Sequence, residues 1–598
     1  QPLAGAQIDV VGTNLGALTD ENGRYFINFV PAGVYDIRAQ FLGYRTVRVS
    51  GQRVLAGQTT DIHFRLEAAP VEIEPLVVVG ERNPLVPRDQ VSSKAIITGD
   101  AIDALPVDNP SEVITLQPGV VVTNQGRTIR GSRPNEEAVY IDGVLVRRYS
   151  TGLAEPLELP TNAIEQVDVI TGGLGARYGE SQSGVVNYVT QRGGPDYRGS
   201  VSLFTDQIAP ASWRTFFNRA EGSFGGPILR DRNLTFYLSG VAEGQKYGPV
   251  NDGFRNVPIF VASGVDTVFR LPRAGSASGA VDSVDVAFPS FELWENGRTR
   301  PFDFSDRYIV HGKVAWGFAQ GSNLSLSYTR QRNQDVALAF GLLNGNSELY
   351  NPQGWDAAYN TSDLLTLSGY FLFSRTPGGQ LALDFRASYQ RHYSQFGEPD
   401  PRWLNDHVDP FAGFNFSNVK FLVNADDWPV SERLIQAVRS GVLPAESLQV
   451  FPGRFDLDTR QAVPGLDQNL RANPYGLRRF FSIGGFGNGG LEYRTDEIFF
   501  FSAALDWQLG RFNRIQAGGD LELIDARRQR VPLFTGTALP ELNEPVRASL
   551  FYQHRLDIED MVIDAGLRWD YFDPNGVYSR VPGFVFNVPD SLKADFVR

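Results

Sequence analysis

The chain has 598 residues, which is too long for one hydrophobic core and predicts several domains. It carries 55 Lys and Arg residues against 68 Asp and Glu residues, and this acidic balance argues against nucleic acid as the main partner. The lack of cysteine excludes disulfides and cysteine metal sites. No apolar run reaches the length of a transmembrane helix. No export signal opens the chain either, so we expect a mature or truncated start.

Residues 1 to 70 alternate short apolar runs with turn residues, a spacing typical of a small β-sandwich. The expected strands cover residues 7–11, 24–27, 35–39, 46–49 and 60–64. The characteristic positions are Gly5-Ala6, Thr19-Asp20, Gly23-Arg24-Tyr25, Pro31-Ala32-Gly33-Val34-Tyr35 and Gly43-Tyr44. This pattern resembles a carboxypeptidase-regulatory-like domain whose first strand is missing. No catalytic group stands out, so we expect a structural role.

Residues 71 to 90 form a connector with a β-branched run. The run 76–79 lies between Glu74 and Glu81. An extended segment of this kind can add as a strand to the sheet edge of another protein. The alternative is an ordinary strand of a neighbouring domain. Pro84 and Pro87 keep the rest of the connector extended.

Residues 91 to 195 mix short helices with short strands, which indicates a separate domain. Helical turns are expected over 101–106 and 111–116, with Ser111 as the N-cap of the second. Strands are expected over 120–123, 128–130, 138–141, 166–170 and 185–190. Asp142-Gly143 is a strong signal for a two-residue hairpin turn.

An ordered set of motif residues runs through this domain. It comprises Arg130, Gly131, Arg133, Asp142, Gly143, Gly172, Gly173, Arg177, Tyr178, Gly179, Gly184 and Asn187. This order resembles the plug domain of TonB-dependent outer-membrane receptors. Inside a barrel, the three arginines would pair with carboxylates of the wall, and ordinary surface cations are the alternative. The glycines favour tight turns and close backbone approach. A dinucleotide-binding loop is rejected because a strand follows them instead of a helix.

The same resemblance places a TonB box in the connector. The expected box residues are Glu74, Pro75, Leu76, Val77, Val78, Val79 and Gly80. The resemblance implies that the periplasmic protein TonB pairs with this segment by β-strand addition.

From residue 196 to 598 the sequence alternates apolar and polar residues. Clear examples cover 308–316, 381–390, 514–523 and 563–571. A membrane-spanning strand of about 10 residues presents one face to lipid and the other to a wet lumen. A soluble sandwich would alternate too. Connections that are alternately short and long favour the barrel, and the long ones cover 244–305, 332–363 and 392–496.

The sequence predicts a mainly β chain: a small N-terminal sandwich, an α/β plug and part of a large antiparallel transmembrane barrel. About 11 wall strands can be recognised, whereas the resemblance implies about 22. The chain ends without the terminal aromatic strand of such barrels, so we expect that about half of the wall is missing from it.

No enzyme site or cofactor site is recognisable in the sequence. The five histidines show no metal-ligand spacing. Asp400, Asp406, His407 and Asp409 cluster in a long loop, where a solvated loop is favoured over a cation site. The sequence therefore predicts no enzyme, no cofactor and no metal.

The resemblance implies active import of a scarce nutrient across the bacterial outer membrane, with the N-terminal domain in the periplasm. TonB would pull on the connector and use the inner-membrane proton gradient. The expected partners are TonB, outer-membrane lipid and a small-molecule, glycan or peptide substrate. A binding-only receptor or adhesin on the same scaffold is the first alternative. A soluble β-rich glycan-processing enzyme is the second, but the paired catalytic carboxylates that it needs cannot be placed.

Overall fold

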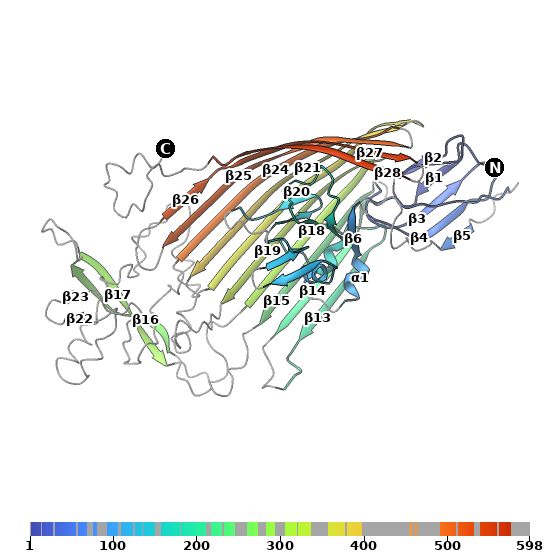
Figure 1. Ribbon diagram of the computed structural model, residues 1–598. Coiled ribbons are helices and arrows are strands. Elements are labelled where there is room, and N and C mark those ends of the chain that lie inside the picture. The colour runs from blue at the N-terminus through green and yellow to red at the C-terminus, as the bar shows by residue number, and fades with distance from the viewer. Residues whose placement is uncertain are drawn as a thin grey trace.

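Three β-rich parts follow one another along the chain in the computed structural model (Figure 1). The structure describes residues 2–13, 15–27, 30–55, 58–68, 76–79, 92–105, 109–123, 126–133, 136–149, 157–179, 181–210, 217–229, 233–245, 260–272, 283–293, 305–319, 321–336, 357–376, 379–397, 455–456, 461–462, 491–509, 512–531, 539–558 and 561–575. Within these ranges, no helix has the length and apolar character needed to cross a bilayer.

The N-terminal domain is built on one five-stranded sheet in the order β2-β1-β3-β4-β5. The strands are β1 (Gln7–Val10), β2 (Gly16–Leu18), β3 (Gly33–Gln40), β4 (Val47–Val54) and β5 (Leu76–Val79). Ile8, Val10, Ile37 and Ala39 form the buried core of this sheet. The first four strands pair antiparallel to their neighbours, and β5 pairs in parallel with β4.

Two expected strands of this domain are not ladder strands. Residues 24–27 and 60–64 belong to no strand. Their apolar side chains still cover the core, as Tyr25, Ile27 and Phe64 show. The alternation of apolar and polar residues therefore predicted correctly which side chains cover the core. It was wrong in predicting that these two segments form strands. The three residues of β2 are too few to alternate, which is why the sequence did not reveal that strand.

The plug domain contains a mixed sheet in the order β10-β9-β12-β11-β6. Its strands are β6 (Ser93–Thr98), β7 (Val120–Thr123), β8 (Gly126–Ile129), β9 (Glu137–Ile141), β10 (Val144–Val146), β11 (Ile164–Gly172) and β12 (Gly184–Thr190). Its helices are α1 (Gly99–Asp103), α2 (Pro110–Thr115) and the 3-10 turn η1 (Thr161–Ala163). β7 and β8 pair separately as a hairpin. Buried aliphatic residues such as Val113, Val139, Val167 and Val186 form the core between helices and sheet.

The second helix begins differently from the prediction. Asn109 is the N-cap of α2, and its side chain accepts a hydrogen bond from the Ser111 N–H. Pro110 occupies the first helical position, where its missing N–H costs nothing. The prediction of Ser111 as the N-cap is therefore wrong by two positions.

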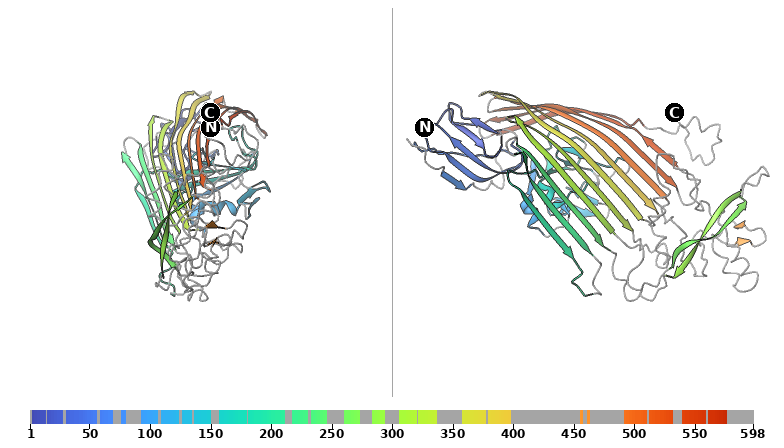
Figure 2. Two further views of the ribbon diagram at one scale, coloured as in Figure 1. Left: turned by 90° about the vertical axis from the view of Figure 1, so that its left-hand side faces the viewer. Right: turned by 180° about the vertical axis from the view of Figure 1, so that it is seen from behind.

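The third part is a long antiparallel wall. Its path runs β13-β14-β15-β18-β19-β20-β21-β24-β25-β27-β28, which confirms the predicted number of about 11 strands. The strands are β13 (Arg198–Thr205), β14 (Asn218–Leu229), β15 (Leu234–Gln245), β18 (Ser305–Ala319), β19 (Ser322–Val336), β20 (Ala357–Thr376), β21 (Gly379–Gly397), β24 (Leu491–Leu509), β25 (Asn513–Val531), β27 (Val546–Ile558) and β28 (Met561–Asp573). The sheet curves around the plug domain, which lies on its concave side (Figures 1 and 2).

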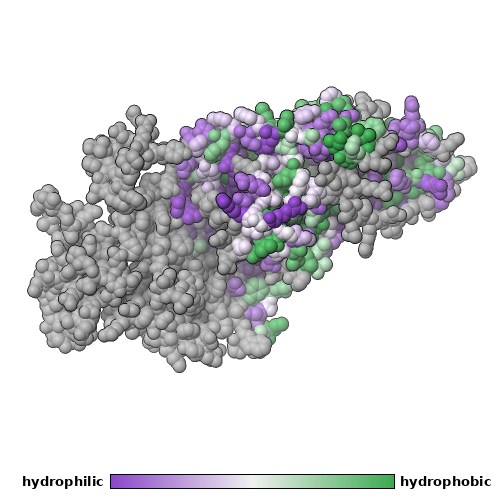
Figure 3. Space-filling view, in the orientation of Figure 1, coloured by the Kyte–Doolittle hydropathy of each residue, from purple (hydrophilic) through white to green (hydrophobic). Residues whose placement is uncertain are grey.

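The two faces of the wall differ as the alternation predicts. On β18, the outward Val310 and Trp316 are exposed, whereas the inward His311 is fully buried against the plug side. Further outward apolar side chains are Leu365, Phe499, Phe501, Leu505, Trp507, Leu567 and Trp569. On the face turned to the viewer in Figure 3, hydrophilic and hydrophobic residues are mixed over the plug domain. The outward apolar face suits lipid, and the polar face suits a wet lumen.

The connections also follow the prediction, with two differences. Short turns join β18 to β19, β20 to β21, β24 to β25 and β27 to β28, and they lie on the side of the N-terminal domain (Figure 1). The segment expected as a long loop over 244–305 contains the hairpin β16 (Phe260–Pro272) and β17 (Ser283–Leu293). The segment 392–496 contains the two-residue strands β22 (Phe455–Asp456) and β23 (Gln461–Ala462). Outside these two segments, the short strand β26 (Leu539–Asn543) pairs with β25. Several wall strands are also longer than a bilayer requires, with 20 residues in β20.

Candidate functional site

The tight turn between β9 and β10 places Asp142 at the surface where the plug meets the wall. Asp142 and Gly143 have φ values of 49° and 78°, which fit the predicted two-residue hairpin. The Asp142 N–H donates to the Tyr188 carbonyl at 2.8 Å. The Gly143 N–H donates to Asn187 Oδ1 at 3.2 Å. These bonds tie the turn to β12, so the Asp142 carboxylate is held in one position.

Lys313 of the wall reaches this carboxylate from β18. Its Nζ lies 3.0 Å from Asp142 Oδ2 and 2.9 Å from Thr190 Oγ1. Thr190 donates its N–H to Asp142 Oδ1 at 2.9 Å and its hydroxyl to Oδ2 at 2.7 Å. Burial raises the pKa of the Asp142 carboxyl, but Lys313 and the Thr190 donors outweigh burial and hold that pKa below its usual range. The carboxylate is therefore charged at neutral pH and links plug to wall.

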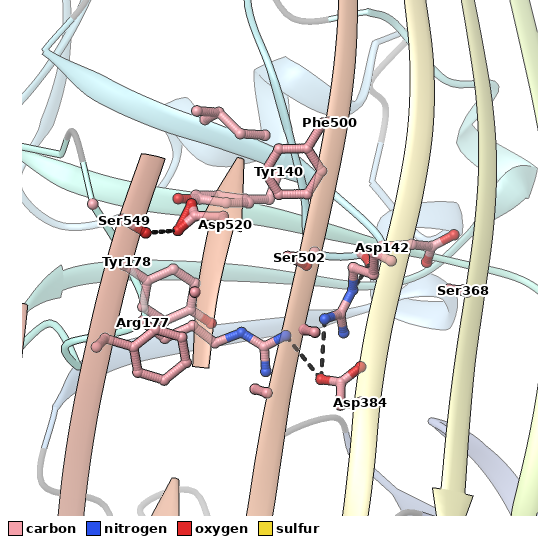
Figure 4. Close-up of a pocket in the computed structure, with 18 of the residues that line it drawn as sticks. Tyr140, Asp142, Arg177, Tyr178, Ser368, Asp384, Phe500, Ser502, Asp520 and Ser549 are labelled. Atoms are coloured by element: carbon pink, nitrogen blue, oxygen red, sulfur yellow. Dashed lines mark hydrogen bonds and ion pairs between the residues drawn. The ribbon is translucent and has the colours of Figure 1, made fainter. Parts of the chain in front are cut away.

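A second ion-pair cluster lies beside the first, on β21. Asp384 Oδ2 accepts from Arg177 of the plug at 2.8 Å and from Arg386 of the wall at 3.0 Å (Figure 4). Arg386 also donates through Nε to the Asp142 carbonyl at 2.8 Å. The side chain of Arg386 lies across Gly143, where an added Cβ would sit 2.6 Å from Nε. Glycine at this turn therefore meets both the left-handed φ and the close approach of the wall.

Other plug segments are tied to the wall in the same way. Arg147 forms an ion pair with Glu522, and Gln390 donates to the Leu145 carbonyl at 2.7 Å. Arg307 Nη1 of β18 lies 3.0 Å from Glu158 Oε2. Further anchors are Thr161 to Glu221, Ala176 to Gln553 and the Arg177 carbonyl to Arg568. These contacts are polar and reversible, so they can hold the plug in the lumen without covalent chemistry.

Apolar packing supports the polar contacts. Leu364 and Phe500 of the wall belong to the same buried cluster as the plug core. Tyr149 of the plug packs against Ile498 and Ile524 of the wall. Plug and wall thus share part of one hydrophobic core, which stabilises the assembled state.

A cavity of about 420 Å³ lies between the plug, the lumen side of the wall and the N-terminal domain. Val30, Pro31 and Ala32 of the N-terminal domain line one side of it. Its cations are Arg177, Lys313, Arg386, Arg547 and Arg568, and its anions are Asp142, Asp384, Asp520, Glu522 and Asp570. Burial raises the pKa of Tyr140 and of Tyr178, so both phenols stay neutral. The balanced lining favours neither an anion nor a cation.

The N-terminal domain touches the plug through Arg53 of β4. Its guanidinium pairs with Asp100 of α1 and lies 3.4 Å from Glu165 Oε1 of β11. Burial raises the pKa of Glu165, whereas the Arg53 charge acts in the opposite direction. Nothing in the sequence pattern marked these three residues.

The remaining motif residues of the plug fall into two groups. Arg130 and Arg133 are exposed, and the Arg130 side chain lies over Gly172, so the structure brings only Arg177 of the three arginines to a wall carboxylate among the described residues. Gly131 and Gly173 have left-handed φ values at exposed positions. Gly179 lies against the wall, where an added Cβ would clash with the Arg568 guanidinium. Gly184 lies in β12 against Ile129, and Tyr178 packs on Tyr140 with ring centroids 5.5 Å apart.

The expected TonB-box segment is only partly described. Leu76–Val79 form β5, which pairs in parallel with β4 of the N-terminal sheet. Glu74, Pro75 and Gly80 lie outside the described residues, as does the loop cluster of Asp400, Asp406, His407 and Asp409. Within the ranges that are described, no group of His, Asp or Glu side chains is arranged to hold a metal ion.

The wall partners of the plug were visible in the sequence only as a type of residue. Lys313, Asp384, Arg386 and Arg568 occupy polar positions of alternating strands, which identifies them as facing the lumen. Strand alternation does not say at which height each one meets the plug, because that depends on the register of the whole sheet.

Two family models match the chain. A carboxypeptidase regulatory-like domain matches residues 1–67, and a TonB-dependent receptor plug domain matches residues 86–186. These models cover the first four strands of the N-terminal sheet and most of the plug sheet, up to the start of β12, whereas β5 lies between the two matched ranges.

The similar curated proteins and the similar solved structures are receptors and transporters. The ferric enterobactin receptor PirA of Pseudomonas aeruginosa is 26% identical over 46% of this chain and 39% of its own length. The vitamin B12 transporter BtuB of Photobacterium profundum is 28% identical over 49% of this chain and 48% of its own length. The solved ferric enterobactin receptor PfeA of Pseudomonas aeruginosa superimposes with a TM-score of 0.46 at 16% identity, over 81% of this chain and 59% of PfeA. The chain thus spans less than half the length of these two curated relatives.

Receptors and transporters, not enzymes, make up this set of relatives. The two matched domains are adjacent and in the order that the structure displays, followed by a curved antiparallel wall with a lipid-suited outer face. On this evidence the chain is similar to TonB-dependent outer-membrane receptors in its regulatory-like domain, in its plug domain and in the relatives that it matches.

Proposed function

We propose that this protein takes part in the active import of a scarce nutrient across the bacterial outer membrane, driven by TonB and the inner-membrane proton gradient. The observation that carries the proposal is the plug held on the concave side of the wall by ion pairs, including Asp142 with Lys313 and Arg177 with Asp384. A lumen filled in this way offers no passage until part of the plug moves. Movement against several buried ion pairs requires work, and a transducer such as TonB supplies it.

The connector is the proposed handle for that work. Residues 74–80 include β5 of the N-terminal sheet and precede β6, the first strand of the plug sheet. Because β6 is an edge strand that pairs with β11 alone in the described sheet, tension on the connector would act on it first. The N-terminal domain and the short turns would face the periplasm, and the long connections would face outward.

The relatives suggest which cargo to test first. PirA is named for ferric enterobactin and BtuB for vitamin B12. We therefore propose ferric siderophores and cobalamin as the first candidate substrates.

The test compares uptake in cells that carry the full gene product, with and without a proton-gradient uncoupler. Gradient-dependent accumulation of one candidate is the expected result. Deletion of residues 74–80 should abolish this uptake and leave surface binding intact, and replacement of the same residues by a Gly/Ser stretch of equal length is the matched control for connector length. Uptake that survives both changes would overturn the assignment of the TonB box. Surface binding that ignores the uncoupler would favour a binding-only receptor.

A further inference from the structure

Nine lumen-facing side chains in the middle of the wall form a block without formal charges, which we name the neutral block. They are every second residue of 327–331 in β19, of 362–366 in β20 and of 388–392 in β21, counted from the first residue of each range. These three strands lie side by side in the wall (Figure 1), and all nine side chains are buried. The strand registers align them in three rows, so the neutral block measures about 10 Å across the strands and about 13 Å along them.

The neutral block consists almost entirely of hydrogen-bonding groups. Eight of its nine residues are Ser, Thr, Gln or His, and the apolar Leu364 lies at its centre. None of the nine carries a carboxylate, an ammonium or a guanidinium group. Charged lumen-facing residues begin directly outside it, with Lys313 on β18, Arg386 on β21 and Asp496 on β24. The block is therefore an uncharged polar surface inside a charged frame.

Four polar atoms of the neutral block have no hydrogen-bond partner in the part of the chain that the structure describes. They are Thr366 Oγ1, Ser388 Oγ, Gln390 Oε1 and His392 Nε2. Each of these four residues is exposed by 7% or less. Buried polar groups are normally hydrogen-bonded, because an unpaired donor or acceptor costs free energy. Such a concentration of unpaired groups indicates a surface whose partners are polar molecules other than the plug.

Hydrogen bonds and apolar packing hold the plug over the neutral block. Gln390 donates to the Leu145 carbonyl at 2.7 Å, and Gln331 accepts from the Glu158 N–H at 2.9 Å. Further contacts are those of Arg148 with Ser362 Oγ at 3.5 Å and of Leu364 with the plug core. The plug–wall ion pairs described above lie around the block and not within it. Because uncharged hydrogen bonds are weaker than charge-assisted ones, a gap between plug and wall opens at the lowest cost over the neutral block.

We propose that the neutral block is a selective surface for cargo that crosses the lumen, and that it favours uncharged molecules rich in amide or hydroxyl groups over anions. This inference rests on the proposed import function and names the chemical class of its substrate. An amide or hydroxyl group exchanges its hydrogen bonds to water for hydrogen bonds to the block. An anion loses hydration there and meets no cation in return. Of the candidate cargoes, cyanocobalamin is uncharged and carries amide side chains, whereas ferric enterobactin is an anion.

Removal of two unpaired hydroxyl groups tests the selective surface. Thr366→Val combined with Ser388→Ala deletes groups that make no hydrogen bond while the plug is in place, so this double variant should fold as stably as the wild type. Uptake of cyanocobalamin and of ferric enterobactin is measured in cells that carry the full gene product, with and without a proton-gradient uncoupler. Surface binding and the melting temperature of the purified protein are measured in parallel. Thr495→Val is the matched control, because the Thr495 hydroxyl is also buried and unpaired, but this residue has the strand parity of the outward-facing Phe499.

The outcomes separate the selective surface from the import function. The selective surface predicts gradient-dependent uptake of cyanocobalamin in preference to ferric enterobactin. The double variant should lower the rate of cyanocobalamin uptake about tenfold, because two hydrogen bonds to the cargo are lost, with surface binding and melting temperature unchanged. Unchanged cyanocobalamin uptake in the double variant, or preferred uptake of ferric enterobactin, would overturn the selective surface and leave active import standing.

Two further results would also count against the proposal. A loss of uptake that is matched by Thr495→Val, or that comes with a lower melting temperature, would assign the effect to the stability of the wall and overturn the selective surface. The absence of gradient-dependent uptake for both probes in the wild type would overturn the proposed import of these cargoes, and the selective surface with it.

Discussion

At the residue scale, the plug is attached to the wall by ion pairs whose partners come from different domains. Asp142 and Lys313 are both nearly buried, with side-chain exposures of 11% and 12%. Arg391 and Glu497 of the wall form a contrasting pair, 3.6 Å apart and exposed by 53% and 38%. Removal of one partner from a buried pair leaves a charge without compensation, whereas an exposed pair contributes little.

Lys313→Met is therefore expected to loosen the turn at Asp142. The unpaired carboxylate should cost about 3–5 kcal/mol, which corresponds to at least a hundredfold faster local opening at about 1.4 kcal/mol per factor of ten. Hydrogen exchange of the peptide over residues 140–148, followed by mass spectrometry, measures this opening. The Arg391→Met control should change exchange by less than a factor of about five.

A double variant identifies the cause. Asp142→Asn combined with Lys313→Met removes both charges, so it should recover part of the protection that Lys313→Met loses. Equal exchange in the wild type and in Lys313→Met would contradict the anchoring role of this pair.

At the scale of elements, the β9–β10 hairpin is shaped to fit beneath a side chain of the wall. Gly143 has a φ of 78°, and Arg386 occupies the space where a Cβ would project. Arg386 uses this position to reach the Asp142 carbonyl. The hairpin and β21 are therefore mutually dependent, although the sequence separates them by more than 200 residues.

Gly143→Ala is expected to weaken this contact. The left-handed backbone costs a non-glycine residue about 1–2 kcal/mol, and the new methyl group displaces Arg386 from the Asp142 carbonyl. The temperature at which a protease begins to cleave the plug in outer-membrane vesicles should fall. Gly194→Ala is the control, because nothing lies within 4 Å of its added Cβ. The same cleavage temperature for both variants would show that Arg386 does not depend on glycine at this turn.

At the scale of the whole molecule, the three parts form a connected stack. The N-terminal domain contacts the plug through Arg53. Its residues 30–32 line the cavity that lies between this domain, the plug and the wall. The plug contacts the wall at several separate points along residues 142–177. Force applied to the N-terminal domain can therefore pass from domain to domain through specific side chains.

Arg53→Glu is expected to release the N-terminal domain, because it places an acid beside Asp100 and Glu165. Nitroxide labels on Leu42→Cys and Met561→Cys, both exposed in the structure, report the distance between this domain and the β27–β28 hairpin. The distance distribution should be narrow with Arg53 and broad with Arg53→Glu. Arg38→Glu is the control, since Arg38 pairs with Asp9 of its own domain. A narrow distribution in all three proteins would mean that Arg53 does not hold the domain in place.

The sequence by itself determined the order of the parts and the type of each. Alternation over residues 308–316 or 381–390 predicts a strand with a lipid face, because side chains of a strand point alternately to opposite sides. Asp142-Gly143 predicts its hairpin because few other residue pairs adopt two consecutive left-handed conformations. These are local properties, so a single segment is sufficient to reveal them.

Only the tertiary structure decided which residues meet. Lys313, Asp384 and Arg386 are recognisable as lumen-facing, but their partners on the plug depend on the registers of strands far apart in the chain. The pairing of β5 with β4, and the contact of Arg53 with the plug, likewise join segments with no shared local signal. Long-range pairing is a property of the assembled sheets, and for that reason the contacts that anchor the plug emerged only with the fold.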